Sequence, residues 1–200
     1  MDTMTRKSIA VSCVVAAVLL ASSGCATGGR AKPTAEEAKL PKFVLRVNCA
    51  ALEPYTDQAG NVWLADQLAE AEKTWGAVGG MTIDRGEVSI AGTDAPKVYQ
   101  TERYSMEAYK FAVPNGAYTV CLHFAETYDG ITGDGQRVFS VAINDQPVLK
   151  DFDPYKEAGG FQKPIVKTIN TVAVKNTALV IAFTANVQNP EINGIEILSE

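Results

Sequence analysis

The sequence has 200 residues, of which 46% are hydrophobic, and its 18 basic and 23 acidic residues give a net charge of −5 at pH 7. This acidic balance argues against nucleic-acid binding, which depends on basic patches that face phosphates. The one histidine and four cysteines do not form the closely spaced clusters that bind zinc, so no metal or cofactor is expected.

The N-terminal segment has the layout of a secretory signal. A short basic stretch precedes an apolar run at residues 9–21, which is shorter than the roughly 20 residues that span a bilayer. The run closes with small residues followed by Cys25, which resembles a bacterial lipoprotein cleavage site. We therefore expect residues 1–24 to be a signal peptide and Cys25 to carry lipid. The alternative is an ordinary signal peptide with a chance cysteine nearby.

The segment that follows, residues 25–42, is rich in glycine, proline and charge, so we expect a flexible, lipid-anchored tether. Ala26 rather than aspartate follows the cysteine, which in a Gram-negative cell indicates the outer membrane rather than retention at the inner membrane. The expected product is an exported bacterial lipoprotein, anchored at the outer membrane or cell surface. Its net charge is −6 once residues 1–24 are removed. The remaining ~155 residues suit one domain.

Alternating apolar residues predict β-strands through most of this domain. The predicted strands cover residues 43–48, 118–125, 138–143, 148–149, 179–183 and 195–197. Neither face of the 118–125 segment is strongly polar, so we expect this strand to be central in its sheet. Turn residues at 114–116 and 144–147 separate strands.

Helical signals are few. Residues 64–72 have the spacing of two helical turns, with Leu64 and Leu68 on one face. Many short strands separated by turns predict an all-β fold with at most short helices. We expect a two-sheet β-sandwich, jelly-roll-like and galactose-binding-like, over residues 43–199.

Two cysteines, Cys49 and Cys121, lie in the predicted domain and would meet an oxidising compartment after export. Either they form a disulfide or both are free thiols that pack as small hydrophobic side chains. A bridge between strands requires a narrow range of Cα separations, so we expect free thiols.

Sequence signatures of enzymes are missing. The single histidine, His123, lies inside a predicted strand among alternating apolar residues, where we expect a structural role. No Ser-His-Asp or Cys-His set can be assembled around it. Carboxylates are plentiful, but no pair can be assigned to glycoside hydrolysis. We therefore expect no catalytic activity, and a cryptic hydrolase is the least favoured alternative.

Aromatic residues instead gather at the ends of predicted strands. Trp75 lies in a glycine-rich segment that we expect not to bury it in a strand, Tyr104 ends the run Gln-Thr-Glu-Arg-Tyr, and Tyr128 follows the 118–125 strand. Rings at such edges can stack on the apolar C–H faces of a sugar, while amide and carboxylate groups hydrogen-bond its hydroxyls. For each ring taken alone, packing in the core is the competing interpretation.

Three stretches have the order and spacing found in the malectin domain. These stretches are residues 98–104, 122–128 and 189–197. Residues 43–198 thus resemble a family of carbohydrate-binding β-sandwiches, also classed as carbohydrate-binding module family 57. In malectin-like domains, loops at one edge of the sandwich form the sugar pocket. The resemblance implies that Tyr104 and Tyr128 line this pocket and that Trp75 stands where the family usually has a tyrosine.

The sequence departs from the family pattern at two positions. Asp129 stands where malectin has a second aromatic residue, and Gln188 replaces an acidic residue two positions before the late proline. The expected ligand-binding residues are Trp75, Tyr104, Glu126, Tyr128, Asp129, Gln188 and Asn189. In contrast, we expect Trp63 to be a packing anchor, and Glu102 and Arg103 to fix the loop through hydrogen bonds.

The function implied by the resemblance is non-catalytic recognition of a glucose-containing di- or oligosaccharide at the cell envelope. The expected partners are thus carbohydrate and, through the lipid anchor, the membrane. The alternative is a structural lipoprotein that uses the same sandwich to hold another envelope protein, which the sequence does not identify.

Overall fold

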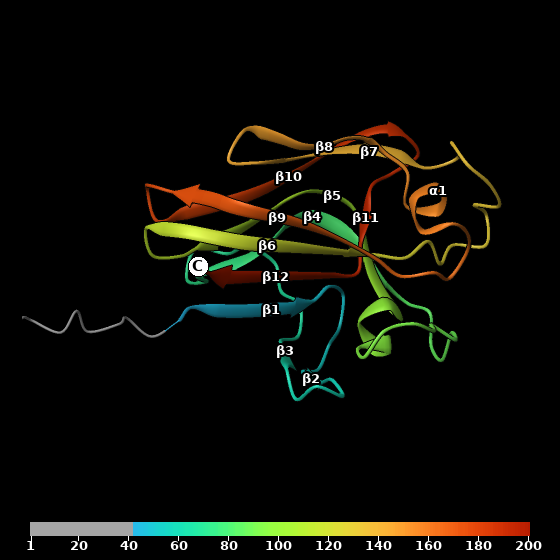
Figure 1. Ribbon diagram of the computed structural model, residues 1–200, viewed down its shortest axis with the longest axis horizontal. Helices are drawn as coiled ribbons and strands as arrows, with labels where there is room; N and C mark the ends of the chain where they lie inside the picture. The colour runs from blue at the N-terminus through green and yellow to red at the C-terminus, as the bar shows by residue number, and fades with distance from the viewer. Residues whose placement is uncertain (1–41) are drawn as a thin grey trace, which may run out of the picture. The chain divides into compact units, whose positions relative to one another are not determined.

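The computed structural model describes residues 42–200 of the chain. The expected signal peptide, the lipidation site at Cys25 and the expected tether except for Lys42 lie outside the described residues. No helix within residues 42–200 is both long and apolar enough to cross a membrane. The described domain is built mainly from antiparallel strands (Figure 1).

One sheet has four strands in the order β1-β12-β6-β9, all antiparallel (Figure 1). These strands are β1 (Val44–Asn48), β12 (Gly194–Ser199), β6 (Gly116–Phe124) and β9 (Ile165–Val174). Strand β6 pairs with a neighbour on each side, which confirms the prediction that it is central.

The second sheet has six strands. Five follow the order β11-β5-β10-β7-β8. Strands β10 and β11 pair with different parts of β5, and β4 also pairs with β5, along most of its length. These strands are β4 (Trp75–Asp84), β5 (Thr101–Ala112), β7 (Val138–Ile143), β8 (Gln146–Phe152), β10 (Ala178–Val187) and β11 (Glu191–Ile192). A separate short hairpin pairs β2 (Tyr55–Thr56) with β3 (Val62–Trp63).

The hydrophobic core lies between the two larger sheets and is formed by alternating side chains of their strands. In β6, the buried side chains are Val120, Leu122 and Phe124. In β10 they include Leu179 and Ile181. The period-two pattern in the sequence therefore marks the inward faces, and the predicted all-β sandwich is confirmed.

Residues 64–72 do not form a helix, so the prediction of two helical turns there is wrong. Leu68 instead makes a parallel bridge to Ala77 of β4. The Ala69 N–H donates to the Ala77 carbonyl at 2.8 Å, across to another segment rather than along a helix. These tertiary hydrogen bonds outweigh the helical spacing of the two leucines, since helix propensity is a weak local preference.

The helices of the described part are short: α1 (Pro154–Ala158) and the 3₁₀ turn η1 (Pro96–Tyr99). Asp153 caps the N-terminus of helix α1, and its carboxylate accepts the Lys156 N–H at 3.0 Å. Gly159 caps the C-terminus in the left-handed conformation, with φ of 77°. This agrees with the expectation of short helices only.

Trp63 is a packing anchor, as predicted. Its side chain is buried, and its indole N–H donates to the Asp57 carboxylate at 3.0 Å. Its ring meets the His123 ring edge-on, with centroids 5.1 Å apart. His123 is itself buried, with Nδ1 2.8 Å from the Tyr99 hydroxyl and Nε2 3.0 Å from the Glu196 carboxylate. Its position confirms a structural role.

Cys49 and Cys121 are both free thiols, as predicted. Cys49 belongs to the core between the sheets. Cys121 is half-buried in β6, where its sulfur lies 3.7 Å from the Thr168 hydroxyl of β9. The two thiols therefore have different partners and do not meet.

Candidate functional site

Strand ends and loops beside the second sheet surround a hollow of about 270 Å³. Its lining residues are Ile83, Arg85, Glu102, Tyr104, Tyr128, Arg137, Gln188 and Asn189. They come from the end of β4, the start of β5, the loop after β6, the residue before β7 and the turn between β10 and β11. Pairing of β5 with both β4 and β11 brings these distant segments together. The volume is close to the lower end of small-molecule sites, roughly 300–1,000 Å³.

Two tyrosine rings form part of this lining. Tyr104 lies in β5, and its hydroxyl is 3.6 Å from the Met81 sulfur of β4. Tyr128 follows β6 and is 40% exposed, with the Arg85 guanidinium 5.6 Å from the centre of its ring. The cation helps to hold the ring in place, and the exposed part of the ring remains accessible. The rings thus offer apolar surface on which a flat ligand can stack.

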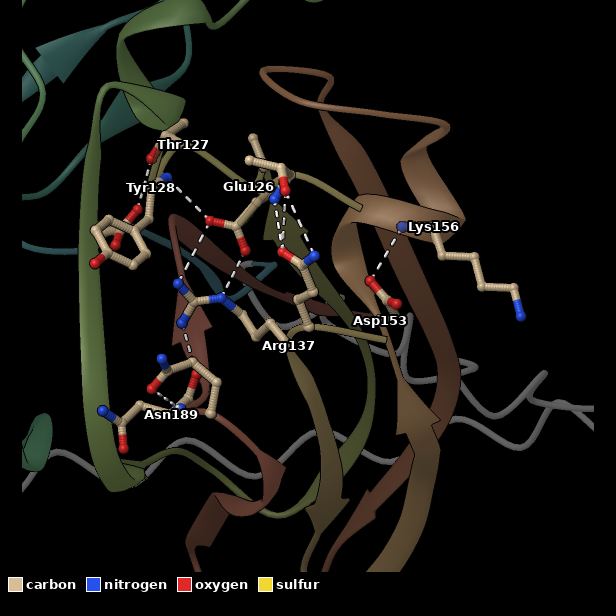
Figure 2. Close-up of polar contacts among 12 residues, drawn as sticks. Glu126, Thr127, Tyr128, Arg137, Asp153, Lys156 and Asn189 are labelled. Carbon is tan, nitrogen blue, oxygen red and sulfur yellow. Dashed lines mark hydrogen bonds and ion pairs between the residues drawn. The ribbon is translucent and has the colours of Figure 1, made fainter. Parts of the chain in front are cut away.

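The Arg137 guanidinium ties two walls of the hollow together (Figure 2). Its Nε donates to Glu126 Oε2 at 2.6 Å, and its Nη1 donates to the backbone carbonyl of Asn189 at 2.6 Å. Glu126 Oε1 also accepts the backbone N–H of Tyr128 at 2.9 Å. One buried ion pair therefore fixes both the Tyr128 loop and the Asn189 turn, so the site is preorganised.

Glu102 makes a second ion pair at the same hollow. Its Oε1 accepts from Arg85 Nη2 at 2.9 Å, and its Oε2 accepts from the Thr127 hydroxyl at 2.6 Å. The prediction that Glu102 fixes the loop is confirmed, and the side chain also lines the hollow. Arg103 does not line it; its Nε donates to Asp66 at 2.8 Å, which confirms the predicted supporting role.

A third carboxyl group, that of Glu191 in β11, is fully buried and has no hydrogen-bond partner for either oxygen. Burial, and next the proximity of the Glu102 carboxylate, raises the pKa of Glu191 well above its ordinary value. Burial therefore favours the protonated, uncharged form of this side chain. The charges of the two guanidiniums, Arg85 and Arg137, are balanced by the two carboxylates paired with them.

Four of the predicted ligand-binding residues line the hollow together: Tyr104, Tyr128, Gln188 and Asn189. Glu126 lies behind this surface, fully buried, with its carboxylate bound to Arg137. Asp129 is exposed and is not part of the lining. The grouping expected from the sequence is thus found for four residues, whereas Glu126 supports the hollow from behind.

Trp75 does not join these residues, so the expectation that it lies beside both tyrosines is wrong. It opens strand β4 and pairs with Phe111, on which its ring is stacked with centroids 6.1 Å apart. Tyr104 pairs with Met81, six residues farther along the same strand, which corresponds to roughly 20 Å. The glycine-rich segment is therefore a strand, contrary to prediction, and it carries Trp75 away from the hollow.

Sequence reasoning missed three of the lining residues: Ile83, Arg85 and Arg137. Arg85 and Arg137 each lie within two residues of a glycine turn and next to a strand end. This placement was the only available signal, because their carboxylate partners lie 17 and 11 positions away, outside any local motif. Among the described residues, no three His, Cys, Asp or Glu side chains gather in a way that could hold a metal ion.

Comparison with known proteins shows the family. The model of the malectin domain matches residues 43–195, so the chain belongs to the malectin family. Malectin domains are non-catalytic carbohydrate-binding modules.

Two curated relatives show how far the similarity extends. Malectin of Mus musculus is 40% identical over 65 residues, which cover 31% of this chain and 22% of that protein. The protein named "Probable LRR receptor-like serine/threonine-protein kinase RFK1" of Arabidopsis thaliana is 27% identical over an alignment of 209 positions. This alignment covers 84% of this chain and 20% of that protein. The chain therefore spans about a fifth of the length of these two relatives.

Among solved structures, a β-glucuronidase of Bacteroides uniformis matches with a TM-score of 0.71 and 25% identity. The match covers 79% of this chain and 18% of the β-glucuronidase chain. The similarity is thus to one part of a much longer protein.

Proposed function

We propose that this chain is a non-catalytic lipoprotein module that binds a glucose-containing di- or oligosaccharide at the bacterial cell envelope. The observation that carries the proposal is the grouping of Tyr104 and Tyr128 with Gln188 and Asn189 around one hollow. Tyrosine rings suit the C–H faces of a pyranose, and amide groups both donate to and accept from its hydroxyls. The membrane anchor in this proposal rests on the apolar run and cysteine at residues 9–25.

The charge balance of the hollow supports a neutral sugar. Arg85 and Arg137 are each paired with a buried carboxylate, so the positive charge of each guanidinium is already balanced. An acidic ligand would add a further negative charge beside the Glu102 and Glu126 carboxylates. A neutral, glucose-type ligand adds no charge to this balanced site.

The same ion pairs support binding without catalysis. Glycoside hydrolysis requires two carboxyl groups that face the scissile bond, one as acid and one as base or nucleophile. Glu126 is held by Arg137 behind the hollow, and Glu102 by Arg85 and Thr127. Glu102 and Glu126 are thus engaged in fixing the walls of the hollow.

Calorimetric titration of a panel of glucose disaccharides tests the proposal. Wild type should bind at least one of them, and Tyr104→Ala and Tyr128→Ala should each lower the affinity about 10- to 100-fold, because truncating an aromatic anchor commonly costs ~1–3 kcal/mol. Tyr155→Ala, on helix α1, is the matched control and should bind as wild type does. The melting temperature of each variant shows that the fold is kept.

Two outcomes would contradict the proposal. If the folded wild type binds no sugar of the panel, a module that holds another envelope protein becomes the better account. If the tyrosine variants melt much earlier than wild type, the rings are core residues rather than ligand contacts.

A further inference from the structure

Among residues 42–200, the buried side-chain nitrogen and oxygen atoms that lack a hydrogen-bond partner belong to two residues of the candidate site. They are Arg85 Nε and both carboxyl oxygens of Glu191. Buried polar atoms in folded proteins are nearly always hydrogen-bonded, so each exception requires an explanation. Here a free donor and two free acceptors occur at one site, which indicates that they act together.

Glu191 lies on the face of the sheet that carries the hollow. It is paired directly with Tyr104 of β5, which lines the hollow. Paired residues of antiparallel strands have their side chains on the same face of the sheet. Glu102, two residues before Tyr104, shares this face and also lines the hollow. Because Glu191 is fully buried, its carboxyl group lies beneath this lining rather than in it.

The charged groups around Glu191 leave one carboxyl group without a counterion. Burial has the largest effect on the pKa of Glu191, followed by the charges of Glu102, Arg137, Glu126 and Arg85. The cluster thus contains three carboxyl groups and two guanidiniums. Arg85 is paired with Glu102 at 2.9 Å, and Arg137 is paired with Glu126 at 2.6 Å. A third negative charge would be buried without a counterion, so the cluster favours one bound proton.

Glu191 is the carboxyl group that holds this proton best. The other two carboxyl groups each accept a hydrogen bond from a guanidinium, and such a bond favours the charged form of a carboxyl group. Glu191 accepts no hydrogen bond at either oxygen. While it carries the proton, both guanidiniums can remain with their present partners.

Loss of the proton from Glu191 would act on Arg85 first. Arg85 Nε is a donor without an acceptor. Arg137, by contrast, already uses its Nε for Glu126 and its Nη1 for the Asn189 carbonyl. An ionised Glu191 therefore attracts the free N–H of Arg85 more readily than it detaches Arg137, since a charge-assisted hydrogen bond is a strong one.

The position of Arg85 matters for the wall of the hollow that Tyr128 forms. Its guanidinium lies 5.6 Å from the centre of the Tyr128 ring. It also pairs with Glu102, whose other oxygen accepts the Thr127 hydroxyl at 2.6 Å. A shift of Arg85 towards Glu191 would take the cation from the ring and the counterion from Glu102. The wall would then be less well ordered, and a ligand that has to order its site binds more weakly.

We propose that Glu191 is a positioning residue of the candidate sugar site, and that its proton keeps Arg85 on Glu102 and over the Tyr128 ring. When Glu191 ionises, it draws Arg85 away and weakens sugar binding. This inference rests on the proposed function and adds a proton-dependent control to it. Sugar affinity is full while Glu191 is protonated, and it falls as pH rises through the folded-state titration of this group.

Calorimetric titration of a glucose disaccharide that binds, repeated from about pH 5 to about pH 9, tests this role. Wild-type affinity should fall about fivefold or more over this range, which is an ordinary size for coupling between two sites. Glu191→Gln stays uncharged, so it should bind as wild type does at the lower pH and show no such fall. Glu157→Gln, at an exposed glutamate, is the matched control and should keep the wild-type profile.

The NMR signal of the Arg85 Nε–H, recorded without sugar, gives a second measurement. It should move with pH in wild type, with the same midpoint as the affinity profile, and should stay unmoved in Glu191→Gln. A wild-type affinity that does not depend on pH, or that falls equally in Glu191→Gln, overturns the role of Glu191 and leaves the proposed function intact. If no disaccharide binds, the proposed function fails. The Arg85 signal then decides alone: a response to pH supports the positioning role, and no response overturns it.

Discussion

The ring of Tyr128 lies directly over Gly130. A Cβ atom at position 130 would be 2.5 Å from both Cε1 and Cζ of this ring and 2.8 Å from its hydroxyl oxygen. The absence of a side chain at Gly130 is therefore what lets the ring occupy its position at the hollow. Because the atoms in conflict belong to the far end of one side chain, an added methyl group would move the ring rather than the backbone.

Gly130→Ala should weaken sugar binding about tenfold or more while it changes the free energy of unfolding by only about half a kcal/mol, since the ring is partly exposed. Gly133→Ala is the matched control, because the nearest atom to its Cβ would be Gln136 Nε2 at 3.7 Å, an ordinary contact. Calorimetric titration and thermal unfolding of both variants check this. Equal affinities for the two would show that the ring position does not matter for binding.

The buried pair of Glu126 and Arg137 should be among the most sensitive interactions of the domain. Arg137→Met should lower the free energy of unfolding by ~3–5 kcal/mol, because it leaves the Glu126 carboxylate buried without its counterion. The double variant Glu126→Gln/Arg137→Met should recover part of that loss, since no unpaired charge remains. Denaturant unfolding measures both.

The exposed pair of Glu157 and Lys167 provides the control for this test. Its two charges are 2.6 Å apart, but the glutamate side chain is 46% exposed, so water screens the interaction. Glu157→Gln should change the free energy of unfolding by less than about 1 kcal/mol. A similar loss at both pairs would contradict the special role of the buried one.

Glu191 should make stability depend on pH. A glutamate in the unfolded chain titrates near pH ~4.3, and burial raises the pKa of Glu191 in the folded state. The protonated side chain therefore contributes its full stability below the unfolded pKa, and this contribution is lost as pH rises towards the folded-state pKa. Glu191→Gln keeps a neutral side chain at all pH values, so its melting temperature relative to that of wild type should increase as pH rises above the unfolded-state pKa. Parallel pH profiles for the two proteins would contradict this prediction.

Much of the sandwich could be predicted because inward side chains alternate with a period of two. Strand β6 shows this in Val120, Leu122 and Phe124, all of which are buried. Strand β4 was missed for a physical reason. Its pairing with β5 shifts register between Val78 and Gly79, and Gly79 has a positive φ of 69°. A bulge with positive φ favours glycine. The glycines interrupt the alternating apolar pattern from which the other strands were predicted, so β4 could not be recognised in the sequence.

The candidate site, too, could be predicted only in part. Tyr104 and Tyr128 could be found because they lie in local motifs at strand ends. The role of Arg137 could not, since its carbonyl partner Asn189 is 52 positions away and only the folded sheet order brings the two together. Glu191 was hidden as well, because a glutamate between a proline and an isoleucine gives no local sign of complete burial.

The proposed lipid anchor at Cys25 can be tested in the 200-residue chain. Cys25→Ser removes the thiol that would receive lipid, and each buried CH₂ of an acyl chain contributes about 0.8 kcal/mol to membrane binding. Wild type expressed in a bacterial host should therefore partition into the detergent phase, and Cys25→Ser should partition into the aqueous phase. Cys121→Ser, which replaces a half-buried thiol of the folded domain, is the matched control and should stay with the detergent. Unchanged membrane association of Cys25→Ser would contradict the lipoprotein part of the proposal, and sugar binding by residues 43–199 would then have to be explained without a lipid anchor.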